Sequence, residues 1–107
     1  MSEIPAVPDP QPAPLPSPET VLKRSAVVVS TEVGSRTSMM DIEKGQYFGL
    51  EDVAARVWAL LDSPRSVREI RDQLVQEFDV DATVCETELQ AFLRTLLQNG
   101  LLDVVHL

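Results

Sequence analysis

Residues 47–70, YFGLEDVAARVWALLDSPRSVREI, constrain the fold of this chain more than any other stretch. A first helix is predicted over residues 51–61, because apolar residues recur there at helical spacing. They are Leu50, Val53, Ala54, Val57, Trp58 and Leu61. A stripe of this width is typical of a helix at the centre of a small core, and we interpret its single Trp as a core residue. We expect the other elements to pack around this helix.

Three short strands are predicted before this helix. Residues 26–29 are apolar and mostly β-branched, residues 37–42 alternate in part, and residues 46–50 run directly into the helix. Turns are predicted at residues 33–36 and at residues 43–45, where a glycine allows a positive φ. Strands joined by tight turns form an antiparallel meander, and its third strand is an edge with hydrogen-bonding groups free on one side.

Two further helices are predicted after residue 64. A capping box opens the second at Ser66, and the third starts at Asp81 or Thr83 and runs to about Asn99. Residues 101–105 either add a short strand or pack back on the core. Strands followed by helices indicate an α+β fold. Three strands and then three helices, with a short turn between the last two, resemble a winged helix-turn-helix.

The first 20 residues differ from the rest in composition. Seven of the eight prolines lie between Pro5 and Pro18, and this density removes amide donors and blocks helices and central strands. We predict a disordered or polyproline II-like tail over residues 1–20 and one folded domain over residues 21–107.

Charge and composition exclude several classes of protein. The formal net charge is −8, which disfavours nucleic acid and anionic membranes as partners. No apolar run approaches the roughly 20 residues that cross a bilayer, and the first residues lack a secretory signal, so we expect a cytoplasmic protein. Cys85 and His106 are the only thiol and imidazole, which predicts no disulfide and no zinc site.

Four pieces of this sequence, in order, resemble the PqqD family. They are residues 47–50 (YFGL), 54–61 (AARVWALL), 66–70 (SVREI), and Phe92-Leu93 with Gly100-Leu101. The resemblance covers residues 21–105 and is strongest to the stand-alone members that serve lasso-peptide pathways. One departure is Glu51, because the position after Leu50 often carries Asn in the family. This change removes a helix-capping side chain and does not bear on function.

The resemblance implies a non-catalytic recognition element for ribosomally synthesised and post-translationally modified peptides (a RiPP recognition element). In such domains the leader of a precursor peptide adds as a strand to the third strand and lies in a groove against the third helix. The implied partners are this leader and a leader protease or another maturation enzyme, with no cofactor. An open edge strand also allows a homodimer.

Carried onto this sequence, the leader-binding residues belong to one strand and one helix. They are Gln46, Tyr47, Phe48, Gly49 and Leu50 of the strand, and Leu89, Phe92, Leu93 and Leu96 of the helix. Alternation along the strand places Phe48 and Leu50 on the core face, and Tyr47 and Gly49 on the other.

Two alternative functions stay open on the sequence alone. A winged-helix DNA-binding regulator needs a basic recognition helix, but residues 83–99 carry only Arg94 against Glu86 and Glu88. A small enzyme needs a nucleophile beside a base, and no serine has a His or Lys at a suggestive spacing. Both patterns count against these alternatives, and peptide binding without catalysis is what the family resemblance implies.

Overall fold

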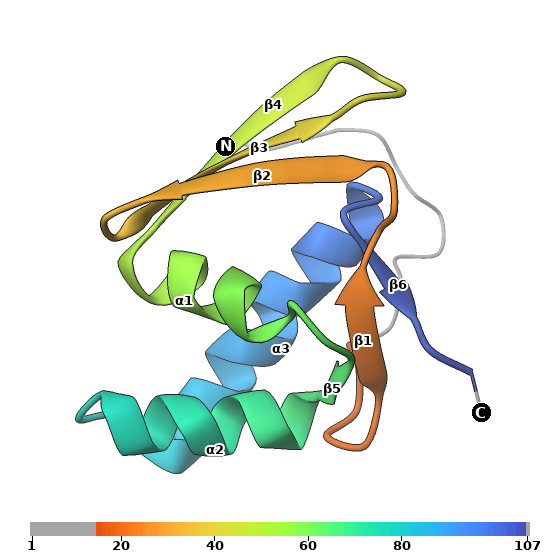
Figure 1. The fold of residues 1–107 in the computed structure, drawn as a ribbon. Helices are drawn as coiled ribbons and strands as arrows, with labels where there is room; N and C mark the ends of the chain where they lie inside the picture. The colour runs from red at the N-terminus through yellow and green to blue at the C-terminus, as the bar shows by residue number, and fades with distance from the viewer. Residues whose placement is uncertain (1–14, 107) are drawn as a thin grey trace, which may run out of the picture.

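The computed structural model describes residues 15–106, so most of the predicted tail lies outside the described residues. In chain order the elements are β1 (Val21–Arg24), β2 (Val28–Val33), β3 (Arg36–Asp41), β4 (Gln46–Glu51), α1 (Asp52–Leu60), β5 (Arg65–Ser66), α2 (Val67–Glu77), α3 (Ala82–Gln98) and β6 (Leu102–Val104). Figure 1 shows one sheet above the three helices and a second, smaller sheet beside them. The predicted α+β fold, with a three-stranded antiparallel sheet and three helices, is confirmed.

The larger sheet is the predicted meander, in the order β2-β3-β4. Its strands are antiparallel and paired over their full lengths, from Val28 opposite Asp41 to Arg36 opposite Glu51. The first strand was expected at residues 26–29, but β2 begins at Val28 and continues to Val33. The shift arises because pairing with β3 extends the strand over residues 30–33. Ser30, Thr31 and Glu32 are polar, and residue 33 belongs to the expected turn, so the apolar pattern did not include them.

The second sheet, in the order β5-β1-β6, was not predicted as a unit. Its central strand β1 carries Leu22, which is completely buried in the core. β6 resolves the alternative for the last residues, because Leu102 to Val104 pair with β1 as a strand. Strands of two to four residues contain too few side chains to show a periodicity, so only their pairing reveals them.

Helix α1 lies between the larger sheet and the other two helices (Figure 1). Trp58 is fully buried, and its Nε1–H donates a hydrogen bond of 3.1 Å to the Ser30 hydroxyl of β2. The guanidinium of Arg24 lies 4.8 Å from the centre of the Trp58 ring and donates to the Trp58 carbonyl at 2.6 Å. These contacts join both sheets to α1 and confirm this Trp as the core anchor.

The predicted apolar stripe of α1 is only partly correct. Val57 and Leu61 are buried, as expected, but Val53 is 43% exposed. Ala55 and Leu60, which the stripe omitted, are buried instead. The reason is that α1 packs against the larger sheet on one side and against the core helices on the other. Its buried face is therefore wider than the predicted stripe and contains different residues.

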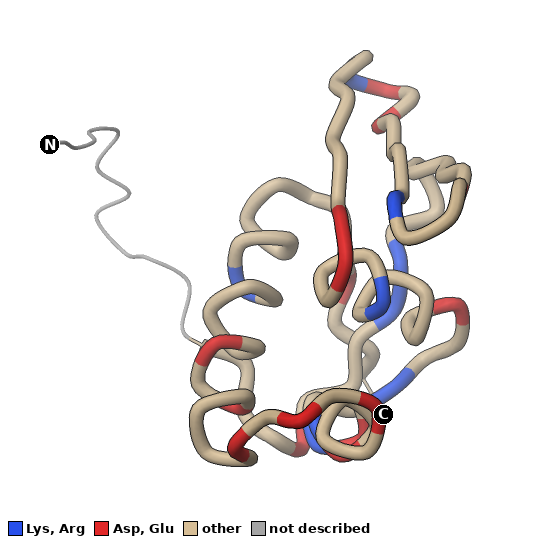
Figure 2. Tube along the Cα trace, turned by 90° about the vertical axis from the view of Figure 1, so that its left-hand side faces the viewer, with Lys and Arg blue, Asp and Glu red and all other residues tan. Residues whose placement is uncertain are grey.

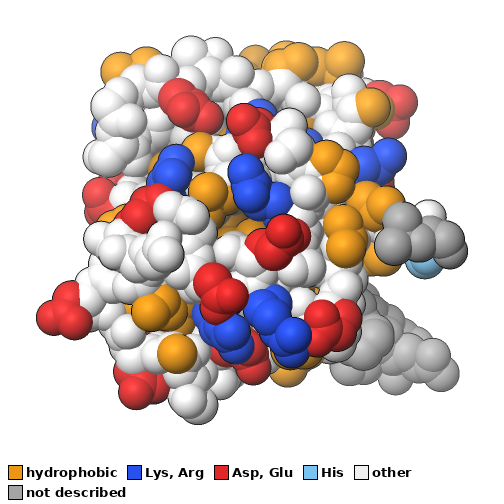
Figure 3. Space-filling view, turned by 60° about the horizontal axis from the view of Figure 1, so that its bottom comes forward, with side chains coloured by type: hydrophobic (Ala, Val, Ile, Leu, Met, Phe, Trp, Pro, Cys, Tyr) orange, Lys and Arg blue, Asp and Glu red, His pale blue; other side chains and the backbone are white. Residues whose placement is uncertain are grey.

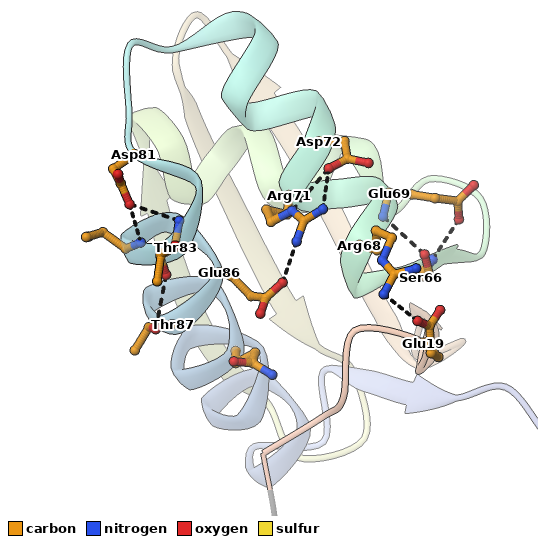
Figure 4. Close-up of polar contacts among 12 residues, drawn as sticks. Glu19, Ser66, Arg68, Glu69, Arg71, Asp72, Asp81, Thr83, Glu86 and Thr87 are labelled. Atoms are coloured by element: carbon orange, nitrogen blue, oxygen red, sulfur yellow. Dashed lines mark hydrogen bonds and ion pairs between the residues drawn. The ribbon is translucent and has the colours of Figure 1, made fainter.

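Side chains cap the other two helices (Figure 4). The capping box of α2 is confirmed: Ser66 N donates to Glu69 Oε1 at 2.8 Å, and Glu69 N donates to Ser66 Oγ at 3.1 Å. In α3 the cap is Asp81, whose Oδ1 accepts from the amides of Thr83 and Val84 at 2.9 and 3.0 Å. Of the two predicted starts, the structure therefore selects the aspartate.

The last residues of the predicted tail lie against the helices. Pro16 is buried, and its carbonyl accepts a hydrogen bond of 2.9 Å from Gln90 Nε2 of α3. The Pro18 carbonyl accepts from the Arg68 amide at 2.9 Å, and the Arg68 side chain forms an ion pair with Glu19 at 2.6 Å (Figure 4). This segment thus satisfies an amide in the first turn of α2, which helix geometry leaves without an internal partner.

Candidate peptide-binding site

Strand β4 is an edge of its sheet, because among residues 15–106 only β3 pairs with it. The direction of its free groups follows from the hairpin between β2 and β3. That hairpin has a two-residue loop with Gly34 at φ +62°, so the closing pair Val33 and Arg36 is hydrogen-bonded. Bonded pairs then alternate along β3, and every second residue of β3, beginning at Thr37, turns its backbone groups toward β4.

The same alternation identifies the free groups of β4. Phe48 and Leu50 lie opposite Met39 and Thr37, and exchange hydrogen bonds with them. The N–H and C=O groups of Tyr47 and Gly49 therefore point away from β3. Within the described residues no strand pairs with this side of β4, so these two residues offer their backbone to a partner.

The side chains of β4 alternate as the sequence predicted. Phe48 and Leu50 are half-buried and pack against the core, whereas Tyr47 is 78% exposed on the other face, which it shares with the exposed Gly49. Gln46, at the start of the strand, alternates with Phe48 on the core side but is exposed as well. A Cβ built on Gly49 meets nothing within 4 Å, so glycine is not required there by the domain itself. Any need for glycine at this position must come from a partner.

An apolar pocket of about 440 Å³ lies between the three helices. It is lined by Val53, Ala54 and Val57 of α1, Leu74 of α2, Phe78, Val80 and Asp81 of the α2–α3 connection, and Val84, Cys85, Glu88, Leu89 and Phe92 of α3. Asp81 and Glu88 are the only charged residues among them. A concave apolar surface of this size is suited to holding one or two large side chains of a partner.

The pocket contains two of the four predicted α3 residues. Leu89 and Phe92 line it, while Leu93 and Leu96 are buried in the hydrophobic core and do not reach it. The α1 lining and the α2–α3 connection were missed. Their sequence signal is weak: Val53, Val80 and Val84 are large apolar side chains that remain exposed, and an unpartnered apolar residue is visible only once the fold is known.

The edge of β4 and the pocket are held in a fixed relation by the junction at Asp52. This residue has a φ of +56°, which is uncommon for a side chain other than glycine but is tolerated by Asp, and its N–H donates to the Ser35 carbonyl at 2.9 Å. β4 thus passes into α1 without a loop. In Figure 2, β4 ends in an acidic segment and stands between β3 on one side and α3 on the other.

The charged side chains near the helices are largely paired with one another. Arg56 forms two hydrogen bonds of 2.7 Å to the Glu77 carboxylate, and these, with one from Gln73, lower the pKa of Glu77 from 4.5 to about 2. Arg71 bonds Asp72 at 2.7 Å and Glu86 at 2.6 Å (Figure 4). On the face in Figure 3, basic side chains lie beside acidic ones and form no continuous basic area.

The pocket contains one thiol, that of Cys85. Burial and the nearby Glu88 carboxylate raise the pKa of the Cys85 thiol, which disfavours the reactive thiolate. Over residues 15–106, no three His, Cys, Asp or Glu side chains gather as metal ligands would.

In the same part of the chain no helix has the length and apolar character that crossing a bilayer requires.

Comparison with known proteins identifies the family. The sequence profile described as coenzyme PQQ synthesis protein D (PqqD) matches residues 36–102. The chain belongs to the PqqD family, as its sequence pieces indicated. The search of curated proteins gives no match.

Solved structures extend this comparison. The structure "TbiB1 in complex with the TbiA(beta) leader peptide" is similar at 36% identity and a TM-score of 0.73, over 76% of this chain and 94% of that one. A lasso peptide synthetase B1 complexed with its leader peptide matches at 22% identity and 0.69, over 77% and 96%. The PqqD truncation of Methylobacterium extorquens PqqCD, a stand-alone RiPP recognition element, matches at 24% and 0.68, over 82% and 94%. The last two show that the fold is shared.

Proposed function

We propose that this chain is a non-catalytic RiPP recognition element that binds the leader of a precursor peptide. The observation that carries the proposal is the free edge of β4 next to an apolar pocket, on a domain 36% identical to TbiB1, whose structure holds a leader peptide. Strand addition to an edge with side-chain pockets beside it is a common mode of peptide recognition.

In this mechanism the leader adds to β4 as a further strand. Its backbone exchanges hydrogen bonds with Tyr47 and Gly49, whose groups face away from β3. Alternate leader side chains point toward α3, where Phe92 and Leu89 receive an apolar one in the pocket. Main-chain bonds supply affinity that depends little on sequence, and the pocket supplies selectivity. Since a flexible leader loses conformational entropy on binding, moderate affinity is expected together with large apolar burial.

The second part of the proposal concerns delivery. A domain that holds only the leader leaves the rest of the precursor free for a separate maturation enzyme. We propose that the domain delivers the precursor to a leader protease and a cyclase of a lasso-peptide pathway. The resemblance to stand-alone members of the family and the 36% identity to TbiB1 support this proposal. The raised pKa of Cys85 and the apolar pocket support a role without catalysis.

The direct test is a calorimetric titration of the full chain. The proposal predicts that a short precursor-like peptide is encoded beside the gene, next to reading frames for a protease and a cyclase, and the leader half of that peptide is the ligand. We expect one leader per domain and an exothermic signal with negative heat-capacity change. Absence of binding at tens of micromolar would rule out the leader function.

The free edge also permits pairing with β4 of a second copy, giving a homodimer. In that case leader and second copy compete for Tyr47 and Gly49. Sedimentation velocity would then show a dimer without leader that becomes monomeric when leader is added. A dimer that persists at saturating leader would place its interface elsewhere.

A further inference from the structure

The mouth of the apolar pocket carries charge of one sign. The two charged residues that line it, Asp81 and Glu88, are both acidic, and no Lys or Arg lines it. One oxygen of Asp81 is already occupied in capping α3, where it accepts two amide hydrogen bonds. The Glu88 side chain, in contrast, forms no hydrogen bond or ion pair with any of residues 15–106.

Two arginines on the helices that line the pocket already have acidic partners. Arg56 of α1 is held by both oxygens of Glu77, and Arg71 of α2 is held by Asp72 and Glu86. Each guanidinium therefore already has a carboxylate partner. The local excess of negative charge is consistent with the net charge of −8 of the whole chain.

The position of Glu88 makes its charge effective inside the pocket. It lies one helical turn after Cys85, and its carboxylate contributes, after burial, to the raised pKa of that thiol. It also follows Val84 by four residues, so both side chains occupy the same face of α3. Val84 is 54% exposed and presents apolar surface directly beside the carboxylate. An apolar wall weakens solvent screening and strengthens attraction to a cation.

Resting on the proposed leader function, we propose that Glu88 selects a lysine or arginine of the leader, placed beside the apolar side chain that fills the pocket. The aliphatic stem of such a residue covers Val84 and Val80, while its charged head reaches the Glu88 carboxylate. Long basic side chains combine an apolar stem with a cationic end in this way. The partner is thus an extended peptide with an adjacent apolar and basic pair.

The first experiment is a selection from randomised 12-residue displayed peptides with the full chain as bait. We expect enriched peptides that pair an aromatic or aliphatic residue with Lys or Arg at a constant spacing. Enrichment of apolar peptides without a recurring cation would overturn the role of Glu88 and leave leader binding intact. No enrichment of any peptide would count against peptide binding itself, and therefore against both proposals.

The second experiment measures the affinity of the most enriched peptide by fluorescence anisotropy. Glu88→Gln is expected to weaken binding roughly 3- to 10-fold, more at low salt than at high salt. Asp103→Asn is the matched control, since it removes the same charge from exposed β6 and should change affinity less than about 1.5-fold.

A charge reversal distinguishes a direct contact from a general field. Glu88→Lys should reject the enriched peptide and accept its Lys→Glu counterpart, restoring most of the lost affinity. Equal losses for Glu88→Gln and Asp103→Asn, or no recovery with the reversed peptide, would overturn the proposal. Circular dichroism of each variant verifies that α3 is retained.

Discussion

Strands β1 and β4 lie beside the same core, but they differ in how many neighbours pair with them. β1 is covered on both sides, by β5 and by β6, and its Leu22 is completely buried. Within the described part of the chain β4 is paired only with β3, and its exposed Tyr47 and Gly49 have backbone groups that face away from β3. A strand that is fully paired serves the scaffold, whereas a strand with one open side can serve a partner.

The comparison is tested most strongly at Leu22. Leu22→Ala is expected to reduce the free energy of unfolding by about 2–5 kcal/mol, because it leaves a cavity in the core at a site held between two strands. Urea denaturation followed by Trp58 fluorescence measures the loss. Val104→Ala, on exposed β6, is the control and should lose less than about 1 kcal/mol. Similar small losses for both variants would mean that the second sheet is not part of the scaffold.

For β4 the expected effect is on binding instead of stability. Gly49→Pro removes an amide that faces outward, so the fold should survive while leader affinity falls at least about tenfold. Gly49→Ala keeps the amide, and its Cβ has free space in the domain, so stability should be unchanged. Phe48→Pro removes an amide bonded to β3 and should unfold the sheet. Calorimetry with the leader, together with circular dichroism, separates these outcomes; full binding by Gly49→Pro would exclude strand addition at this edge.

The boundary of the tail gives a smaller effect. Deletion of residues 1–14 is expected to leave stability and leader affinity unchanged. Deletion of residues 1–20 should lower stability by about 1–3 kcal/mol, because it removes the buried Pro16 and the carbonyl of Pro18 that accepts from α2. Thermal denaturation of both truncations compares them. Equal stability would return the domain boundary to residue 20, as the sequence alone predicted.

The smallest effect concerns pH. The pKa of Glu77 is lowered to about 2, so its pairing with Arg56 stabilises the folded state above pH 4.5 and is lost as pH falls from 4.5 toward 2. Glu77→Gln should therefore be slightly less stable than the wild type at pH 6 and equal to it near pH 2. Urea midpoints across this range show the convergence. Leader affinity should not change, since the pair lies outside the β4 edge; a pH-independent stability gap would contradict the assigned pairing.

Long patterned elements were predictable from the sequence, and short ones were not. The capping box at Ser66 and the run of α3 depend on local geometry, and both were found. The faces of Phe48 and Tyr47 followed from period-2 alternation. β1 and β5 exist only through pairing with residues far along the chain, so no local pattern reveals them. Of the pocket, only the α3 residues Leu89 and Phe92 were predicted. Its α1 wall was missed because that wall depends on where the three helices meet, which no local pattern shows.

The left-handed backbone of Asp52 limits which spacings within a partner peptide the domain can accept. Because β4 passes directly into α1 at Asp52, the distance from the outward amides of β4 to the α1 wall of the pocket cannot be adjusted by a loop. We therefore expect the domain to discriminate by length: a leader with one residue inserted between its strand segment and its pocket side chain loses one contact or the other. Asp52→Val would strain this backbone, while Asp52→Gly would relax it and tolerate a wider range of spacings. Selectivity would then reside partly in a single backbone torsion.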